Sequence, residues 1–546
     1  MPSPTLQWLS LVGVIWLQSI NGTNTNFPAY SSQLKLLLSL SQLQLNNLAF
    51  ASDAGKLFGL ISGVASVYLP LYLVLMIGSL LGLTGYGLQY LFLASQTSSL
   101  SFCHVFFLSI LAGNSICWIN TVCYVVTIQN FPSYHQVAVG LSTSYVGLSA
   151  KIYTDIVDAF VPSSPIKRAK AYLLLNSILP LLVCIISAPI VRIIDVGKPS
   201  RMDGGFIVMF AITVATGIFS VISSFRSAST MGSLIGIGTF LLAPLMVPLA
   251  EQTRDAFKLR WRTNREGRVY DFTIDEKNVA ESVEDGKEQN EKIAEAQEIH
   301  VKEEIGVKLM LGRIDFWLYF FVYISGATLG LVFLNNLGQI AESRQCSRIS
   351  SLVSLSSSFS FFGRLLPSLL DYFLSRSKHL MSRPASVVLL LMAPLSGAFF
   401  LLVNGANFSL YLGTAIIGVC TGAITSIAVS MTTELFGTKN FGKNHNVVVA
   451  NIPLGSFVFG YTAALLYRRE GNGEGRCLGI ECYKKTFITW GSLCVLGTFF
   501  AFVLHNSKVL CPKTSQQQQI LTGNLLLTVD EAHTREILAQ SQLITH

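Results

Sequence analysis

Long apolar runs separated by short polar segments restrict the fold of this chain more than any other feature of its sequence. The runs lie at residues 6–20, 45–66, 68–93, 102–128, 135–158 and 170–193, then at 205–226 and 232–250, and last at 314–336, 350–373, 382–403, 408–431, 446–467 and 485–505. An α-helix rises about 1.5 Å per residue and the hydrocarbon layer is about 30 Å thick, so nearly every run is long enough to span a bilayer. The backbone must satisfy its own hydrogen bonds in lipid, and this pattern therefore predicts an all-α membrane protein.

The runs fall into groups of six, two and six, and a charged stretch precedes the last six. We accordingly expect an N-terminal six-helix bundle (1–193), an extra hydrophobic helix pair (194–250), a charged linker (251–313), a C-terminal six-helix bundle (314–505) and a polar tail (506–546). The extra pair allows two interpretations. It either crosses the membrane twice, giving 14 transmembrane helices, or forms a re-entrant pair beside a core of 12.

Composition excludes a water-soluble protein. Charged residues make up only 12% of the chain and hydrophobic residues 51%, whereas soluble domains carry about 25% charged residues. The net charge of +8 is spread over short loops, which is typical of the positive-inside bias of membrane proteins and does not indicate nucleic acid. The bias predicts that both termini and the linker 251–313 are cytoplasmic. It leaves open the plasma membrane and the endomembranes, that is, the endoplasmic reticulum or the vacuole.

No catalytic or nucleotide-binding motif is present in the sequence. It contains no HExxH motif, no GxSxG motif in a strand–helix context and no Walker loop. We therefore expect no enzyme activity, no cofactor and no metal site, and nothing supports transport driven by ATP.

Two stretches in different halves share an order of features. Residues 111–153 and 417–467 each run from a helix rich in small residues, through a polar turn with Phe and His, to a Gly/Ser-rich helix ending in Tyr. Matching halves of this kind are the trace of a duplicated transporter.

The stretch 361–376, FFGRLLPSLLDYFLSR, places charges where an apolar run meets a basic segment. We predict a gating loop here, between the second and third helices of the C-terminal bundle; its residues are Gly363, Arg364, Asp371 and Arg376. Charged groups at such a position can form interhelical bonds in one conformation and release them in another. An ordinary ion pair that anchors a helix end is the alternative. The counterpart in the first half, residues 62–73, has no charged residue.

Two pairs of opposite charges lie inside apolar runs. Asp53 and Lys56 are three residues apart, and Lys151 and Asp155 are four apart, so each pair shares one helix face. Each pair is a candidate part of a pathway for a solute or ion, because ionisable groups at membrane depth are costly. A structural ion pair that holds helices together is an equal alternative.

Two further features concern covalent modification. Cys477 and Cys482 are five residues apart in a polar loop and are candidates for a disulfide in an oxidising compartment. Asn21, in Asn21-Gly22-Thr23, is a candidate glycosylation site that lies close to the membrane.

The gating-loop pattern resembles the loop motif of the major facilitator superfamily. Within it, the chain resembles the plant nodulin-like proteins of the nuclear-fusion-defective type over residues 30–59, 112–132, 138–156, 315–343 and 434–446. This resemblance implies two pseudo-symmetric bundles whose first, fourth, seventh and tenth helices line a cavity. By that implication Asn114, Asn120, Tyr323 and Thr421 are candidates for solute contact, and the alternative is that they hydrogen-bond helices to one another.

These observations favour a secondary transporter that carries a small polar or charged solute by alternating access. Its partners would be the bilayer, the solute and, as a candidate coupling ion, the proton. A protein of another class is the alternative: a membrane scaffold or regulator that keeps the transporter fold without transporting.

Overall fold

The computed structural model describes residues 3–95, 101–161, 164–194, 202–225, 229–254, 256, 305–346, 349–374, 384–471 and 477–506. Within these ranges the chain is helical and contains no strand. Most of the linker 251–313, nearly all of the tail 506–546, and Arg376 lie outside them.

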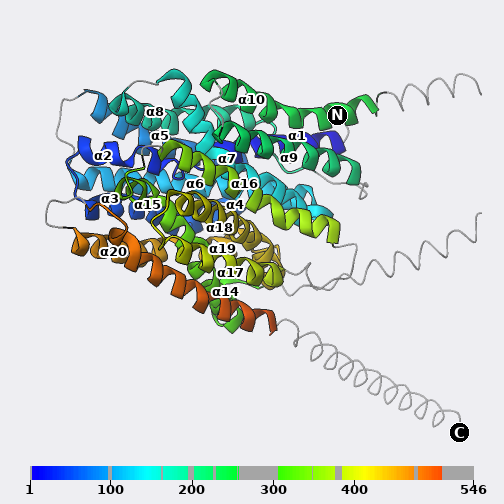
Figure 1. Ribbon diagram of the computed structural model, residues 1–546. Helices are drawn as coiled ribbons and strands as arrows, with labels where there is room; N and C mark the ends of the chain where they lie inside the picture. The colour runs from blue at the N-terminus through cyan, green and yellow to red at the C-terminus, as the bar shows by residue number, and fades with distance from the viewer. Residues whose placement is uncertain are drawn as a thin grey trace, which may run out of the picture.

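The N-terminal half consists of helices that run back and forth along one axis (Figure 1). They are α1 (Ser3–Ile20), α2 (Ser31–Leu37), α3 (Gln42–Ala54), a 3₁₀ turn η2 (Gly55–Phe58), α4 (Gly59–Tyr68), α5 (Leu71–Ser95), α6 (Phe102–Asn130), α7 (His135–Phe160) and α8 (Pro165–Ser187). Together α3, η2 and α4 form a single span, Leu43–Tyr68.

The C-terminal half repeats this arrangement. Its helices are α13 (Val307–Leu311), α14 (Ile314–Tyr323), a π-helical segment η5 (Ile324–Thr328), α15 (Leu329–Ser343), α16 (Ile349–Leu374), α17 (Pro384–Leu401), α18 (Asn407–Phe436), α19 (Phe441–Val449), α20 (Asn451–Glu470) and a last helix, Glu481–Asn506. Here α14, η5 and α15 form one span, Ile314–Ser343, and α19 with α20 forms another, Phe441–Glu470.

The largest contacts between the two halves are made by two helix pairs. One pair is α7 of the N-terminal half with α16 of the C-terminal half, and the other is α3 with α20. The approach in the first pair is close, because a Cβ added to Gly147 would lie 2.5 Å from the backbone nitrogen of Phe361. Small residues permit such contacts between membrane helices.

The extra helix pair lies on one side of this interface and contacts both halves. It is formed by α9 (Asp203–Phe225) and by α10 (Thr230–Leu242), which continues through a 3₁₀ turn η4 (Ala243–Leu245). The spans Asp203–Ser224 and Thr230–Arg254 are each long and apolar enough to cross a membrane. Contacts of α9 with α7 and α16 fix the pair against the bundle.

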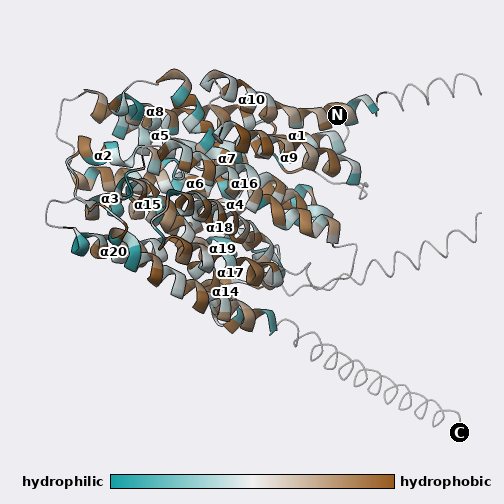
Figure 2. Ribbon diagram, viewed as in Figure 1, coloured by the Kyte–Doolittle hydropathy of each residue, from teal (hydrophilic) through white to brown (hydrophobic). Residues whose placement is uncertain are grey.

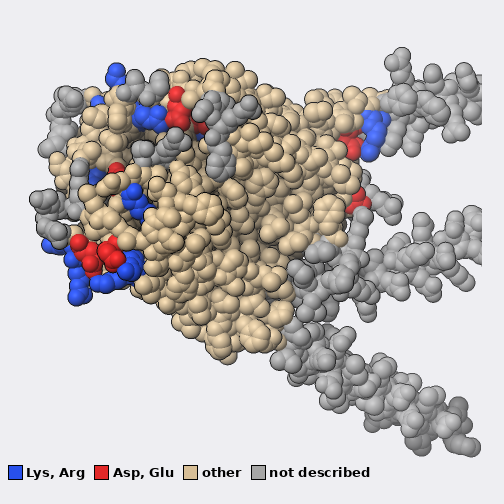
Figure 3. All heavy atoms as spheres, in the orientation of Figure 1, with Lys and Arg blue, Asp and Glu red and all other residues tan. Residues whose placement is uncertain are grey.

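Eleven of the described helices have the length and composition of membrane spans. The fold is that of an all-α membrane protein with two bundles, as the apolar runs predict. Hydrophobic residues make up much of the helices (Figure 2), and many large hydrophobic side chains are exposed on them. The charged side chains in view gather towards the two ends of the bundle, with an uncharged surface between them (Figure 3). A bilayer explains this surface, because lipid tails solvate exposed apolar side chains.

Candidate functional site

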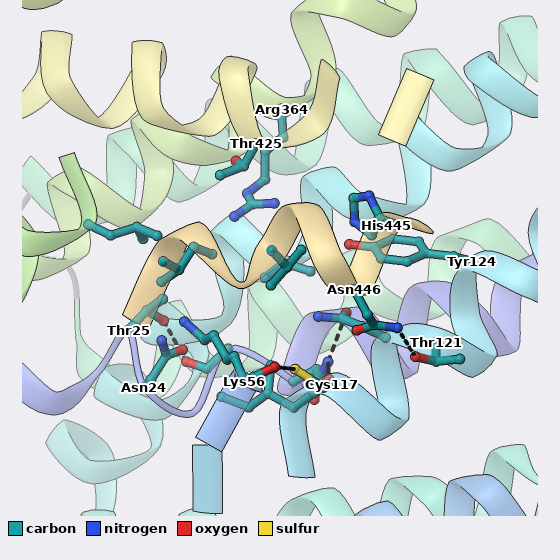
Figure 4. A pocket seen from close by; sticks show the side chains of 18 of the residues that line it. Asn24, Thr25, Lys56, Cys117, Thr121, Tyr124, Arg364, Thr425, His445 and Asn446 are labelled. Atoms are coloured by element: carbon teal, nitrogen blue, oxygen red, sulfur yellow. Dashed lines mark hydrogen bonds between the residues drawn. The ribbon is translucent and has the colours of Figure 1, made fainter. Parts of the chain in front are cut away.

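A cavity of about 110 Å³ lies between the two halves, and we call it the central cavity. The N-terminal half contributes Asn21, Gly22, Asn24, Thr25, Lys56, Ile116, Cys117, Asn120, Thr121, Tyr124 and Val146 to its wall. The C-terminal half contributes Tyr323, Leu331, Arg364, Thr425, Phe441, Gly442, His445, Asn446, Val449 and Ile452. Residues of both halves therefore surround the same space, which is lined by charged, amide and apolar side chains (Figure 4).

Lys56 reaches the central cavity from the 3₁₀ turn η2, and Asp53 lies one turn earlier in α3. Side chains three residues apart eclipse one another in 3₁₀ geometry, which brings this pair together. The Nζ atom of Lys56 lies 2.6 Å from Oδ1 of Asp53, and both residues are buried. The turn fits here because Gly55 has no Cβ, which would lie 2.2 Å from the carbonyl oxygen of Ile110 in α6.

Asp53 also connects the two halves. Its Oδ2 atom accepts hydrogen bonds from Asn335 Nδ2 of α15, at 3.2 Å, and from Ser456 Oγ of α20. One carboxylate thus neutralises Lys56 within its own half and accepts two hydrogen bonds from the other half. The sequence predicts the ion pair from the residue spacing but not these contacts across the interface.

Arg364 enters the central cavity from α16, on the side opposite Lys56 (Figure 4). Its guanidinium lies near the hydroxyls of Tyr124 and Tyr323, which line the same space. Among the described residues it forms no ion pair, and its Nε has no hydrogen-bond partner. The charge of Arg364 is therefore directed into the cavity and is not matched by a carboxylate of the chain that the structure describes.

The expected gating loop is wrong in its placement, because α16 continues without a break from Ile349 to Leu374. Gly363 and Arg364 lie inside this helix, as does the backbone of Asp371, and Pro367 does not end it. Prolines are tolerated inside membrane helices, where neighbouring helices stabilise the backbone. Gly363 serves close packing, since a Cβ on it would lie 2.1 Å from the carbonyl oxygen of Val419 in α18.

The glycosylation site at Asn21 is also contradicted by the structure. Asn21 follows α1 directly and is 1% exposed. Its Nδ2 donates to Asn120 Oδ1 at 2.9 Å and to the carbonyl of Ile116 at 3.2 Å. The chain turns inward here, so the amide that would carry a glycan forms part of the cavity wall.

The remaining candidates divide into those at the cavity and those away from it. Asn120 and Tyr323 line the central cavity. Thr421 lines a smaller adjoining cavity of about 30 Å³, to which Arg364 also contributes, and its Oγ1 has no partner. Asn114 packs against η2, where its backbone nitrogen would be 2.5 Å from a Cβ on Gly55.

Lys151 and Asp155 form a buried ion pair that faces the extra helix pair. Lys151 Nζ lies 2.9 Å from Asp155 Oδ1, and Ser233 Oγ of α10 donates to Asp155 Oδ2 at 2.7 Å. Because Ser233 of α10 bonds directly to this ion pair, the side chains of Lys151 and Asp155 face α10. Neither residue lines the central cavity. This geometry favours the structural alternative over a role in the solute pathway.

Some cavity residues have no signal in the sequence. His445 lies in a polar stretch of the sequence, yet it is buried, stacks on Phe441 with ring centroids 5.0 Å apart, and its Nδ1 lies 3.3 Å from Thr432 Oγ1. Its neighbour Asn446 donates to Thr121 Oγ1 at 3.4 Å, across the interface. Helix α19 begins at Phe441, five residues before the apolar run 446–467. Its first turn can be polar because it faces the cavity and not lipid.

Cys477 and Cys482 are joined by a disulfide at one end of the bundle, before the last helix. No group of three or more His, Cys, Asp or Glu side chains that could hold a metal ion occurs among the described residues.

Comparison with known proteins agrees with this architecture. The family model described as Nodulin-like matches residues 7–250, and the model described as NFD4, C-terminal domain matches residues 298–510. The protein NUCLEAR FUSION DEFECTIVE 4 of Arabidopsis thaliana is 37% identical over 542 residues, covering 95% of this chain and 92% of that protein.

Solved structures show the same fold at low identity. The proton:xylose symporter XylE, of the major facilitator superfamily and bound to 6-bromo-6-deoxy-D-glucose, matches with a TM-score of 0.53 at 11% identity and covers 92% of this chain and 96% of that one. The xylose transporter XylE from E. coli, in a partially occluded inward-open conformation, matches with a TM-score of 0.52 at 10% identity, over 92% and 99% of the two chains. The chain belongs to the nodulin-like family and has the fold of major facilitator superfamily transporters.

Proposed function

We propose that the protein is a secondary transporter that moves a small polar or charged solute across a membrane by alternating access. The central cavity carries this proposal, because both halves line it with polar groups. A volume of about 110 Å³ equals the share of roughly four water molecules in the liquid, at about 30 Å³ each, which favours a small molecule as the solute.

Contacts between the halves flank the cavity on both sides along the span of α3 and α4. Before Lys56, Asn46 Nδ2 donates to the carbonyl of Gly460 at 3.2 Å, and Asp53 is bonded to α15 and α20. After Lys56, Gly63 meets Gly442, whose carbonyl oxygen would be 2.6 Å from a Cβ on Gly63. Such small polar and backbone contacts can separate at one end while the other end stays closed, as rocking of two bundles requires.

The orientation in the membrane follows from the positive-inside bias. The start of α1, the end of the 230–254 helix and the end of the last helix lie at one end of the bundle (Figure 1). We assign this end to the cytoplasm, which also places the linker 251–313 there.

Flux measurements in proteoliposomes test the proposal. The full chain is reconstituted, and uptake of sugars, amino acids, organic acids and nucleosides is compared with that into protein-free liposomes and liposomes with an active control transporter. Accelerated flux of at least one solute is expected, and a pH gradient imposed in the same assay tests for coupling to protons. If no solute moves faster while the control transporter works, the scaffold alternative is favoured.

A further inference from the structure

The charge of the central cavity points to the class of its solute. Among the described residues that line it, Lys56 and Arg364 carry charge, and none is an aspartate or a glutamate. Lys56 is already neutralised by Asp53, whose carboxylate lies behind it at 2.6 Å. The cavity therefore presents a surplus of one positive charge, and that charge belongs to Arg364.

The surplus charge cannot be removed by loss of a proton, because an arginine guanidinium stays protonated in proteins. A charge held away from bulk water is costly unless a partner compensates for it. In the cavity the described chain offers Arg364 hydroxyl groups, among them those of Tyr124 and Tyr323, but no carboxylate. The partner that fits is a group of opposite charge brought in by the solute.

The planar guanidinium matches the two oxygens of a carboxylate through paired hydrogen bonds. A single carboxylate also balances the surplus charge, whereas a phosphate of about two negative charges would leave the cavity negative. The rest of the wall suits a short organic chain, since Ile116, Leu331 and Ile452 provide apolar contacts and Asn120 provides an amide. We propose that the central cavity binds a small monocarboxylate, with Arg364 holding its carboxylate group.

This inference rests on the proposed function but is tested by binding, so that the two can fail separately. The full-length protein in lipid nanodiscs is titrated calorimetrically with butanoate and lactate, with the uncharged isosteres butanamide and lactamide, and with inorganic phosphate. We expect each carboxylate to bind at least tenfold more tightly than its amide, because the amide cannot pair with the guanidinium charge.

Variants then assign the binding to one residue. Arg364→Gln is expected to lose at least tenfold in carboxylate affinity, while Arg364→Lys, which keeps the charge, retains part of it. The matched control is Arg344→Gln, because Arg344 donates to the carbonyls of Leu402 and Asn404 at a helix end, away from the cavity. This control is expected to bind the carboxylates with unchanged affinity.

In the ligand titrations, three results would overturn the inference: equal affinity for the carboxylates and their amides, no binding of any carboxylate, or tighter binding of phosphate than of either carboxylate. In the variant experiment, unchanged carboxylate binding by a folded Arg364→Gln protein would also overturn it. The comparison of carboxylate with amide uses the unaltered protein, so it decides the question even if Arg364→Gln does not fold. Carboxylate binding without flux would retain this site and refute transport. Flux of an uncharged solute without carboxylate binding would support transport and refute the carboxylate site.

Discussion

Asp53 takes part both in the charge balance of the cavity and in the contact between the two halves. Its Oδ1 neutralises Lys56 and its Oδ2 accepts from Asn335 and Ser456 of the opposite half. Under the proposed alternating access, separation of the halves would break the second set of bonds while the ion pair could remain intact. A carboxylate shared in this way would keep the charge of the cavity constant during that proposed movement.

A double-mutant cycle measures the ion pair. Asp53→Asn preserves the shape of the side chain but leaves the buried ammonium of Lys56 without a counter-charge, so we expect a marked loss of thermal stability in detergent. Adding Lys56→Met should recover part of that loss, giving a coupling free energy of about 1–3 kcal/mol.

The exposed pair Glu481–Lys484 has the same spacing, with Nζ and Oε1 2.8 Å apart, and is the control. The cycle of Glu481→Gln and Lys484→Met should give about 1 kcal/mol or less, because water screens this pair. Equal stabilities of the Asp53→Asn protein and the double variant would show that Asp53 does not neutralise Lys56.

At the scale of single helices, α16 shows what the sequence can and cannot predict. The apolar run 350–373 predicts the helix to within a residue or two of its observed bounds, Ile349–Leu374. The pattern of Gly363, Arg364 and Asp371 nevertheless led to a loop, because a charge in an apolar run is expected at the membrane edge. The charge of Arg364 lies instead in a cavity that forms only when both halves pack together. The sequence of the helix alone does not contain this information.

The packing of α16 against α18 makes Gly363 sensitive to substitution. Gly363→Ala would place a Cβ 2.1 Å from the carbonyl oxygen of Val419, so the helices must separate, and we expect a loss of about 1–3 kcal/mol. Gly397→Ala in α17 is the matched control, since its Cβ would meet no atom within 4 Å. Thermal unfolding of both variants in detergent decides the point. Equal stability of the two variants would contradict the close approach.

The extra helix pair is anchored to both halves at once. Tyr134 of the N-terminal half donates to Asp203 Oδ1 at 3.0 Å, and Tyr372 of the C-terminal half donates to the carbonyl of Asp203 at 3.2 Å. Ser220 of α9 also lies 2.6 Å, Oγ to Oγ, from Ser358 of α16. The pair is therefore bound to both halves, and the rocking motion proposed above would have to bend or slide these contacts.

At the scale of the whole molecule, the apolar runs predict the helices and the duplicated features predict the two halves. The sequence does not predict which helix faces point inward. Asn21 and His445 illustrate this limit, because a sequon and a lone histidine in polar segments look like surface features. Asn21 lies in the turn after α1 and His445 lies in α19; both face the interface, and only contacts between residues far apart in sequence put them there.

The same architecture makes alternating access testable by cross-links at each end of the cavity. A Cβ on Gly338 of α15 would lie 3.3 Å from Ser31 Oγ, and a Cβ on Gly442 of α19 would lie 3.6 Å from Ser66 Oγ. Each pair joins the two halves, so cysteines at Ser31 and Gly338, or at Ser66 and Gly442, are close enough to form a disulfide. The free cysteines, including exposed Cys103, are first replaced by serine or alanine.

Either cross-link should reduce flux of the transported solute at least tenfold, because a cycle that opens the two ends in turn must break both contacts. A reducing agent should restore the flux. The parent protein, treated in the same way, controls for reduction of the native Cys477–Cys482 disulfide, and the single-cysteine variants control for the substitutions. Unchanged flux with either fully formed cross-link would contradict rocking of the two bundles about the central cavity.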